Sequence, residues 1–141
     1  MKKSNRYDIS GLIEAQFEPG SHGRVLKNLL GIKSKREMDR VEAKEQLRAL
    51  EELSGIYDTD HIFTSADICK MHKIWLGKIY GWAGQYRQVN VSKGEFPFAS
   101  AKQIPSLMSS FEKGPLKEYT PCHFSTHEDI ARAIAIVHTE I

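Results

Sequence analysis

Apolar residues recur at helical spacing in four segments of the chain, beginning with residues 34–53. In this first segment they are separated by four, three and three positions, which places them on one face of a helix. These residues are Ala43, Leu47, Leu50 and Leu53. Ser34 and Glu37 have the S-x-x-E spacing of a capping box, and Gly55 follows the last apolar position. The pattern predicts a helix that buries this apolar face and exposes its many charged residues.

A second helix is predicted from Thr64, because Asp67 three positions later completes another capping pattern. Its apolar stripe consists of Ile68, Met71, Trp75, Leu76 and Ile79. Gly81 follows this stripe and is the expected residue just past the end of the helix.

Two more helices are predicted in the C-terminal part of the chain. The first begins near Ser100 and is expected to end at Gly114-Pro115. Its predicted buried residues are Ile104, Leu107, Met108 and Phe111. The second begins at the capping pair Ser125 and Glu128, and alanines occupy its other faces, so it is predicted to be central. Its spaced apolar residues are Ile130, Ile134, Val137 and Ile141.

Between the second and third helices, the period of the pattern changes from helical spacing to strict alternation. Val89 and Val91 alternate with polar residues, and Phe96 and Phe98 alternate again after the turn sequence Lys93-Gly94-Glu95. A proline in the second half has no backbone N–H, so one edge of the ribbon must stay unpaired. The pattern predicts a short β-hairpin that leans on the helices, because a two-stranded ribbon alone is barely stable.

The N-terminal 33 residues carry weaker signals. A short helix is predicted to start near Ser10 and to end at Pro19-Gly20-Ser21. Taken together, the patterns predict a mainly α fold with one small hairpin.

Composition narrows the class of protein without identifying a function. A chain of 141 residues with 40% hydrophobic and 27% charged residues fits one soluble globular domain. The net charge of +2 gives no reason to expect a nucleic-acid partner, and no apolar run is long enough to span a membrane. The basic N-terminus has no apolar segment after it, so no signal peptide is expected. Cys69 is predicted to be a structural thiol, and with only Cys122 besides it a reduced, cytoplasmic setting is expected.

The residue types that carry chemistry do not form a complete catalytic set. Cys122, His123 and His127 lie within six residues, but no second cluster completes a four-ligand site, so no metal site is predicted. His72 and His138 lie on otherwise apolar helices and are predicted to be hydrogen-bonded or at the surface. Phosphate-binding and dinucleotide-binding glycine motifs and the nucleophile elbow of hydrolases are absent from the sequence.

Around the hairpin the sequence resembles a known family. The stretch from Ile79 to Arg87 (IYGWAGQYR), followed by residues 91–99 (VSKGEFPFA), is similar to Fic domains, in which a helix ending in an A-G-x-x-R run leads into a β-hairpin called the flap. Residues 137–141 (VHTEI) resemble the end of the helix that leads into the family signature, H-x-F-x-x-G-N-G-R. The resemblance implies a Fic-like helical bundle over residues 61–141, truncated before its signature. Residues 1–60 would then form an N-terminal region with the charged helix.

The resemblance also implies an activity, a cofactor and a partner. Fic proteins mostly transfer AMP from ATP, with Mg²⁺, to a hydroxyl side chain of a target protein, and the signature histidine is the general base. The flap holds an extended segment of the target along its open edge by β-augmentation. By resemblance, Lys93 and Gly94 would lie near the nucleotide. The target-binding flap would comprise Lys93, Gly94, Glu95, Phe96, Pro97 and Phe98. The two phenylalanines would either anchor the flap or simply pack on the helices.

The sequence departs from the family pattern because it ends before the signature. No catalytic residue, metal ligand or phosphate-binding arginine can therefore be assigned, and His138 precedes the signature and is no substitute. The chain as given is expected to be inactive and not to bind ATP and Mg²⁺ tightly. Two alternatives are a non-catalytic module that binds a protein through the hairpin edge and a phosphotransferase of the toxin branch of the family. Apolar surface on the last helix also makes a homodimer an expectation.

An inhibitory motif is a further expectation from the resemblance. Many Fic proteins are inhibited by a helix with the pattern S/T-x-x-x-E-G/N, whose glutamate pairs with a signature arginine. Ser10 and Glu14 fit this pattern, whereas Ala15 does not fit its last position. The alternative is that Glu14 is an ordinary acidic residue on a helix surface.

Overall fold

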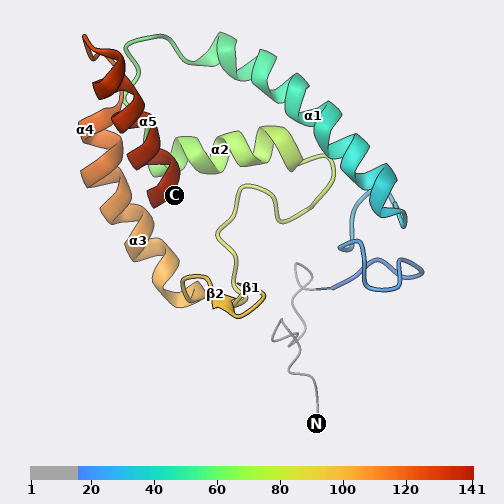
Figure 1. Cartoon of the computed structure of the whole chain (residues 1–141). Coiled ribbons are helices and arrows are strands. Elements are labelled where there is room, and N and C mark those ends of the chain that lie inside the picture. Colours follow the sequence, from blue (N-terminus) through green and yellow to red (C-terminus); the bar gives the residue numbers. More distant parts are fainter. Residues whose placement is uncertain (1–15) are drawn as a thin grey trace.

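The structure is a computed structural model that describes residues 16–141 (Figure 1). The candidate inhibitory residues Ser10 and Glu14 lie outside the described residues. The prediction of a mainly α fold with one small hairpin is confirmed. The elements are α1 (Lys35–Ile56), α2 (Ser65–Leu76), β1 (Ser92–Lys93), β2 (Phe96–Pro97), the 3₁₀ turn η2 (Ala101–Gln103), α3 (Ile104–Phe111), the π-helical turn η3 (Glu112–Leu116), α4 (Lys117–Tyr119) and α5 (His127–Glu140).

The helices form two groups with the hairpin at the lower end of the view in Figure 1. In one group α1 packs across α2, and in the other α3, η3 and α4 follow one another as a nearly continuous rod against which α5 lies. The strands β1 and β2 lie beside the start of the α3 rod, so the hairpin connects the two groups. Among the described residues, none of the helices is long and apolar enough to cross a membrane.

The capping signals of the first two helices are confirmed. The Ser34 side chain accepts a hydrogen bond from the Glu37 amide (3.3 Å), and α1 extends one residue beyond Gly55. At the start of α2, the Asp67 amide donates to the Thr64 hydroxyl (3.2 Å) and the Thr64 amide donates to the Asp67 carboxylate (2.9 Å). This reciprocal pair satisfies two amides that the helix itself leaves without partners.

The predicted end of the second helix is wrong. The helix stops at Leu76 rather than near Gly81. The Ile74 carbonyl, which a continuing helix would offer to the Lys78 amide, accepts from the Arg48 guanidinium, and the Ile79 amide closes a tighter turn on the Leu76 carbonyl. Ile79 is fully buried after this turn and lies at the centre of the main hydrophobic cluster. The cluster consists of Val25, Ile32, Met38, Leu76, Ile79, Tyr80 and Ala83.

The predicted buried face of α1 is also wrong. Ala43, Leu47 and Leu50 face solvent, whereas the buried residues of α1 are Met38 and Ala49 on the opposite side. Polar atoms of the inner face are accommodated by hydrogen bonds to α2 and the turn after it. The Trp75 indole N–H donates to the Glu42 carbonyl (2.9 Å), the Tyr80 hydroxyl to the Glu42 carboxylate (2.8 Å), and the Arg48 guanidinium to the Ile74 carbonyl (2.7 Å). Hydrogen bonds of this kind remove the penalty of burying polar groups, so α1 can pack through its mixed face.

The third predicted helix continues past its predicted end. Gly114 and Pro115 do not stop the chain but lie within the π-helical turn η3, which leads directly into α4. The wider turn gives the proline ring room that a regular α-helix lacks. Of its predicted buried residues, Phe111 is buried whereas Leu107 is half-exposed.

The last helix begins one residue later than predicted and is not central. Thr126, rather than Ser125, accepts the capping hydrogen bond, from the Asp129 amide (3.1 Å). Both positions carry a hydroxyl with an acid three residues later, so the pattern could not distinguish them. Ala133 is the one fully buried residue described in α5, whereas Ile134 is 60% exposed.

Candidate functional site

The hairpin is an antiparallel pair with a two-residue turn. Ser92 lies opposite Pro97 and Lys93 opposite Phe96, so Gly94 and Glu95 form the turn. Gly94 has a φ of 63°, a conformation that glycine adopts without the steric cost of a side chain. Lys93 therefore belongs to the first strand rather than to the turn predicted from the sequence.

Two polar side chains hold the base of the hairpin together. The Arg87 guanidinium donates to the Val89 carbonyl before β1 (2.7 Å) and to the Ala99 carbonyl after β2. On the other side, the Asn90 side-chain oxygen accepts a hydrogen bond from the Ala101 amide (2.8 Å). Because Arg87 contacts both ends of the ribbon, it takes over part of the support that two short strands cannot supply alone.

The exposed part of the hairpin contains all six residues of the candidate flap. In the described part of the chain the sheet has two strands, so neither strand pairs with a third. Phe96 is 67% exposed and Phe98 47% exposed, and their rings meet nearly at right angles with centroids 5.7 Å apart. Phe98 also lines a hollow beside Leu107 and Phe111 of α3, whereas Phe96 does not. The packing interpretation of the two phenylalanines therefore suits Phe98 better than Phe96.

A cavity of about 560 Å³ lies between α2, the segment before the flap, α3 and the C-terminal end of α5. His72, Trp82, Arg87, Val91, Met108 and Ile141 are among its lining residues. The Gly84 amide donates to Nδ1 of His72 (2.9 Å), and burial lowers the pKa of His72, so the neutral ring accepts this bond. The Trp82 indole N–H is buried with no hydrogen-bond partner in the described part of the chain.

Gly84 allows the segment before the flap to cross α2 closely. Its φ is +84°, and a side-chain carbon at this position would lie 2.7 Å from Cβ of Lys73 and 3.0 Å from the Cys69 carbonyl. Only glycine fits such a close approach, which explains the glycine of the A-G-x-x-R run. Arg87, the arginine of the same run, holds the base of the flap through its two hydrogen bonds. The sequence pattern of the run alone shows neither structural role.

Two polar side chains that line the cavity already have hydrogen-bond partners among the described residues. The guanidinium of Arg87 is occupied by two backbone carbonyls, and Nδ1 of His72 by an amide. Among residues 16–141, no three His, Cys, Asp or Glu side chains are grouped so that they could hold a metal ion. His123 instead lies 3.6 Å from the Asp60 carboxylate, and Cys69 and Cys122 are free thiols.

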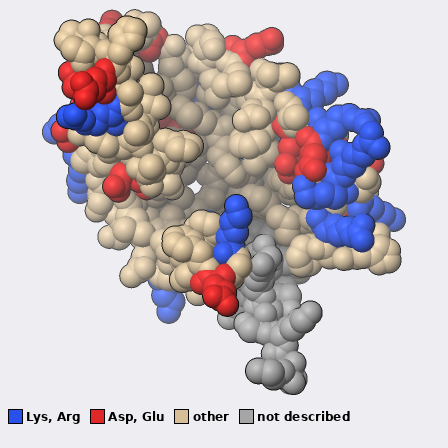
Figure 2. Space-filling model, in the orientation of Figure 1, with Lys and Arg blue, Asp and Glu red and all other residues tan. Residues whose placement is uncertain are grey.

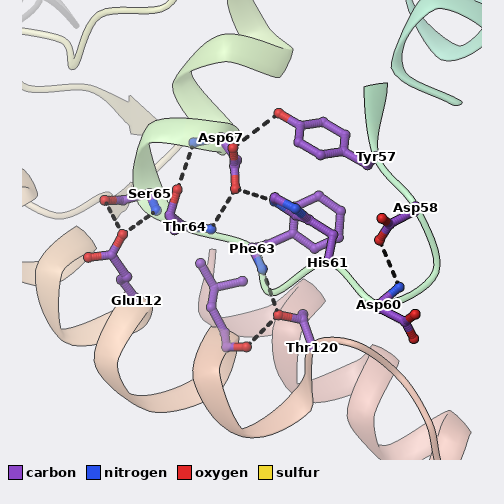
Figure 3. Close-up of polar contacts among 11 residues, drawn as sticks. Tyr57, Asp58, Asp60, His61, Phe63, Thr64, Ser65, Asp67, Glu112 and Thr120 are labelled. Carbon is purple, nitrogen blue, oxygen red and sulfur yellow. Dashed lines mark hydrogen bonds and ion pairs between the residues drawn. The ribbon is translucent and has the colours of Figure 1, made fainter. Parts of the chain in front are cut away.

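A polar network fixes the start of α2 against the second group of helices (Figure 3). The Asp67 carboxylate, besides its bond to Thr64, lies 2.8 Å from Nε2 of His61 and accepts from the Tyr57 hydroxyl (3.2 Å). Burial alone would raise the pKa of Asp67, but the bonds from His61, Thr64 and Tyr57 together lower it.

Two further bonds of this network connect α2 to the α3–α4 rod. The Glu112 carboxylate accepts from the Ser65 amide (2.9 Å), and the Thr120 hydroxyl accepts from the Phe63 amide (2.9 Å). These hydrogen bonds therefore hold together the start of α2 and the α3–α4 rod, the two elements that flank the flap in the sequence.

This arrangement of helices and flap can be compared with known proteins. The family model described as Fic/DOC family matches residues 62–141, which is more than half of the chain. The chain belongs to the Fic/DOC family. The match begins in the loop before α2, so α1 precedes the part that this Fic chain shares with the family model.

Among curated proteins, this Fic chain is similar to the protein adenylyltransferase VbhT of Bartonella schoenbuchensis. The two are 39% identical over 87 residues, which cover 58% of this chain and 17% of VbhT. The chain thus spans less than a fifth of the length of this curated relative.

Two solved structures share the fold. One is the BepC protein of Bartonella tribocorum, a VirB-translocated effector crystallised with AMPPNP, with a TM-score of 0.62 and 20% identity over 82% of this chain and 61% of that one. The other is the FIC domain of the Bep5 protein of Bartonella clarridgeiae, with a TM-score of 0.60 and 18% identity over 89% of this chain and 63% of that one. At these identities the likeness establishes the Fic fold of the chain.

Proposed function

We propose that this chain is the flap-bearing part of a protein adenylyltransferase, which holds an extended segment of a target protein while AMP is transferred to a target hydroxyl. The observation that carries the proposal is the open-edged ribbon of β1 and β2, held at its base by Arg87, in a chain 39% identical to VbhT over the matched region. An open strand edge offers backbone donors and acceptors to a partner chain, and exposed Phe96 adds an apolar contact.

We further propose that the transfer itself depends on a segment carrying H-x-F-x-x-G-N-G-R, which is not among these 141 residues. ATP and Mg²⁺ would be held mainly by that segment, with Lys93 and Gly94 of the flap near the nucleotide. The two free cysteines suit a reducing compartment, and we propose the cytoplasm.

Label transfer from ATP tests the proposal. A lysate is incubated with ATP labelled on its α or its γ phosphorus, together with either the 141-residue chain or a version extended past Ile141 through the signature. Transfer of the α label by the extended version alone supports adenylyl transfer. Transfer of the γ label would instead identify a phosphotransferase, and transfer by the 141-residue chain would overturn its proposed inactivity.

The flap is tested separately with Phe96→Ala in the extended version. Loss of target labelling is expected because this ring is exposed on the flap, and the fold should be retained because the ring is 67% exposed. Leu30→Ala is the matched control, since Leu30 is 51% exposed and lies outside the flap. Equal labelling by the wild-type and Phe96→Ala proteins would count against a role of Phe96 in target binding.

A non-catalytic binding module is the second candidate. The observation that favours it is that the described residues offer an unpaired strand edge but no group of His, Cys, Asp or Glu side chains that could hold a metal ion. Calorimetry with ATP and Mg²⁺ distinguishes the adenylyltransferase from the binding module. A binding module would not bind ATP and Mg²⁺, either as the 141-residue chain or in the extended version.

The inhibitory role of Ser10 and Glu14 is also proposed from the resemblance. If Glu14 pairs with a signature arginine, Glu14→Gly should increase label transfer by the extended version, whereas Glu18→Gly should not. Equal transfer by the Glu14→Gly and unmodified proteins would leave Glu14 an ordinary surface residue.

A further inference from the structure

The outer face of α1 is apolar although it faces solvent. Leu47 is 67% exposed and Leu50 is 56% exposed, and Ala43 one turn earlier is exposed as well. The opposite side of the same helix already supplies Met38 and Ala49 to the interior. Exposed leucines scattered singly are common, whereas exposed apolar side chains that follow one another along a helix can form a contact surface.

The outer stripe of α1 follows one line along the helix. The stripe consists of Arg36, Arg40, Ala43, Leu47, Leu50 and Ser54. Successive members are four, three, four, three and four residues apart, so they lie along one line of the helix. The apolar members Ala43, Leu47 and Leu50 form the centre of this line, and its ends are polar. Among residues 16–141, α2 packs on the inner face of α1 and the residues of the outer stripe are exposed, so a second helix can reach them.

The charged residues on one flank of the stripe are complementary to the same flank of an identical helix. Lys44 and Glu51 are seven residues apart, so they lie on the same flank of the stripe, and both are exposed. When two identical helices pack antiparallel, the same flank of each copy meets, which brings Lys44 of one copy beside Glu51 of the other. Figure 2 shows Lys and Arg side chains gathered at the right of the view, over the N-terminal end of α1. The antiparallel order keeps Arg36 and Arg40 away from their equivalents in the other copy.

We propose that a second copy of this chain packs antiparallel along the outer stripe of α1, with Leu47 of each copy against Leu50 of the other. Ala43 then faces Ser54 on both sides of this centre, and the small side chains let the helices approach closely. The self-complementary flank is the reason for choosing a second copy over an unrelated helix. The apolar area is small, so the dimer belongs to the weak, concentration-dependent class of interfaces, below about 1,200 Å² of total buried surface.

Sedimentation of the 141-residue chain over a concentration series tests the proposal. The chain is expected to shift from monomer to dimer as concentration rises, and Leu47→Glu is expected to raise the dissociation constant by about tenfold or more. Leu47 is exposed in the monomer, so the variant should keep the circular dichroism spectrum and melting temperature of the wild type. A chain that stays monomeric, or a dimer that Leu47→Glu leaves unchanged, overturns the proposal.

Ile134→Glu is the matched control, because Ile134 is 60% exposed on α5, away from α1. The dimer should persist in this variant. If Ile134→Glu dissociates the dimer and Leu47→Glu does not, the interface lies on α5 and the proposal fails.

Charge reversal tests the antiparallel order. Lys44→Glu and Glu51→Lys alone should each weaken the dimer, since each places like charges together, and the double variant should restore it. Restoration supports pairing between copies, because an unrelated partner with its own charges would not recognise the swapped flank. Failure of the double variant to recover dimerisation overturns the proposed pairing.

Discussion

At the scale of single residues, Asp67 does more than cap a helix. Its carboxylate accepts hydrogen bonds from the Thr64 amide and the Tyr57 hydroxyl and lies against the His61 ring, so one side chain fixes both the start of α2 and the loop before it. The capping role could be predicted from the T-x-x-D spacing. The contacts with Tyr57 and His61 could not, because nothing in the pattern shows how the loop folds back.

Asp67→Asn is expected to lower the free energy of unfolding at neutral pH by about 1–3 kcal/mol. In asparagine an NH₂ group replaces one carboxylate oxygen. This group would face a hydrogen-bond donor from which the carboxylate oxygen now accepts. Because folding lowers the pKa of Asp67, its stabilising effect is present above the ordinary value of 3.8 and is lost as the pH falls through the lowered value. Urea unfolding at pH 7 and at low pH should therefore show a difference between variant and wild type that shrinks in acid.

Asp58→Asn serves as the control for this prediction. Asp58 is exposed, and among the bonds described its carboxylate accepts only from the Asp60 amide (3.0 Å), a contact that an asparagine oxygen can also make. Equal losses in the two variants, or a difference for Asp67→Asn that does not depend on pH, would contradict the role given to the carboxylate.

Arg87 is the second residue whose role is specific to its geometry. Two separate nitrogens of its planar guanidinium donate to carbonyls at the two ends of the hairpin, a spread that the compact ammonium of a lysine does not match. Arg87→Ala should accelerate amide exchange at Phe98, whose amide donates to the Val91 carbonyl (3.1 Å), by about tenfold or more. Arg87→Lys should be intermediate, and Lys102→Ala, at an exposed position after the flap, should leave the exchange unchanged.

Hydrogen exchange followed by NMR measures this effect residue by residue. The expected result is faster exchange in the flap with little change in α1, since Arg87 makes no described bond to that helix. Uniformly faster exchange throughout the chain would show that Arg87 supports the whole fold rather than the flap.

At the scale of elements, α1 shows where a sequence pattern and a fold diverge. The leucines at helical spacing correctly predicted a helix, but they form its exposed stripe. Glu42 and Arg48 lie toward the inner face because each bonds to a partner on or after α2. A hydrophobic pattern ranks faces by polarity alone, so it misses a polar face whose hydrogen bonds are supplied by another element.

Because the leucine face of α1 is exposed and the opposite face is buried, the two faces should contribute differently to stability. Met38→Ala is expected to lower the free energy of unfolding by about 2–4 kcal/mol, because Met38 is buried in the main cluster. Leu47→Ala, measured at low protein concentration, should change it by about 0.5 kcal/mol or less. Thermal or chemical unfolding of the two variants decides between the faces. A larger loss of unfolding free energy for Leu47→Ala than for Met38→Ala would mean that the leucine face of α1 is the buried one, as the sequence pattern predicted.

Other elements could be predicted to different degrees. The hairpin and the cap of α2 followed from local rules, since turn glycines and capping side chains act within a few residues. The π-helical turn at Gly114 and Pro115 did not, because proline in a sequence signals an end and only the packed structure shows a widened turn. The position of α5 also depends on contacts with η3 and α4 that its own sequence does not reveal.

At the scale of the whole molecule, the two groups of helices are joined by few described bonds. The N-terminal group contains the main cluster, whereas the α3–α4 rod and α5 pack largely on one another. Between them, the Ser65 amide and hydroxyl both donate to Glu112, at 2.9 and 3.2 Å, and the Phe63 amide donates to Thr120. The flap connects the same two groups at its own base, so its orientation depends on how firmly they are held together.

Glu112→Ala should therefore loosen the second group more than the first. Losing the carboxylate leaves the Ser65 amide at the start of α2 without its partner, at a cost of about 1–3 kcal/mol. Amide exchange should become faster in α3, α4 and α5, while the slowest amides of α1 change less. Glu112→Gln should retain part of the stabilisation, because its side-chain oxygen can still accept a hydrogen bond. Lys113→Ala, at the exposed neighbouring position, should behave as wild type. Equal acceleration in α1 and α5 would show that the chain unfolds as one cooperative unit, and the flap would then rest on a single rigid body.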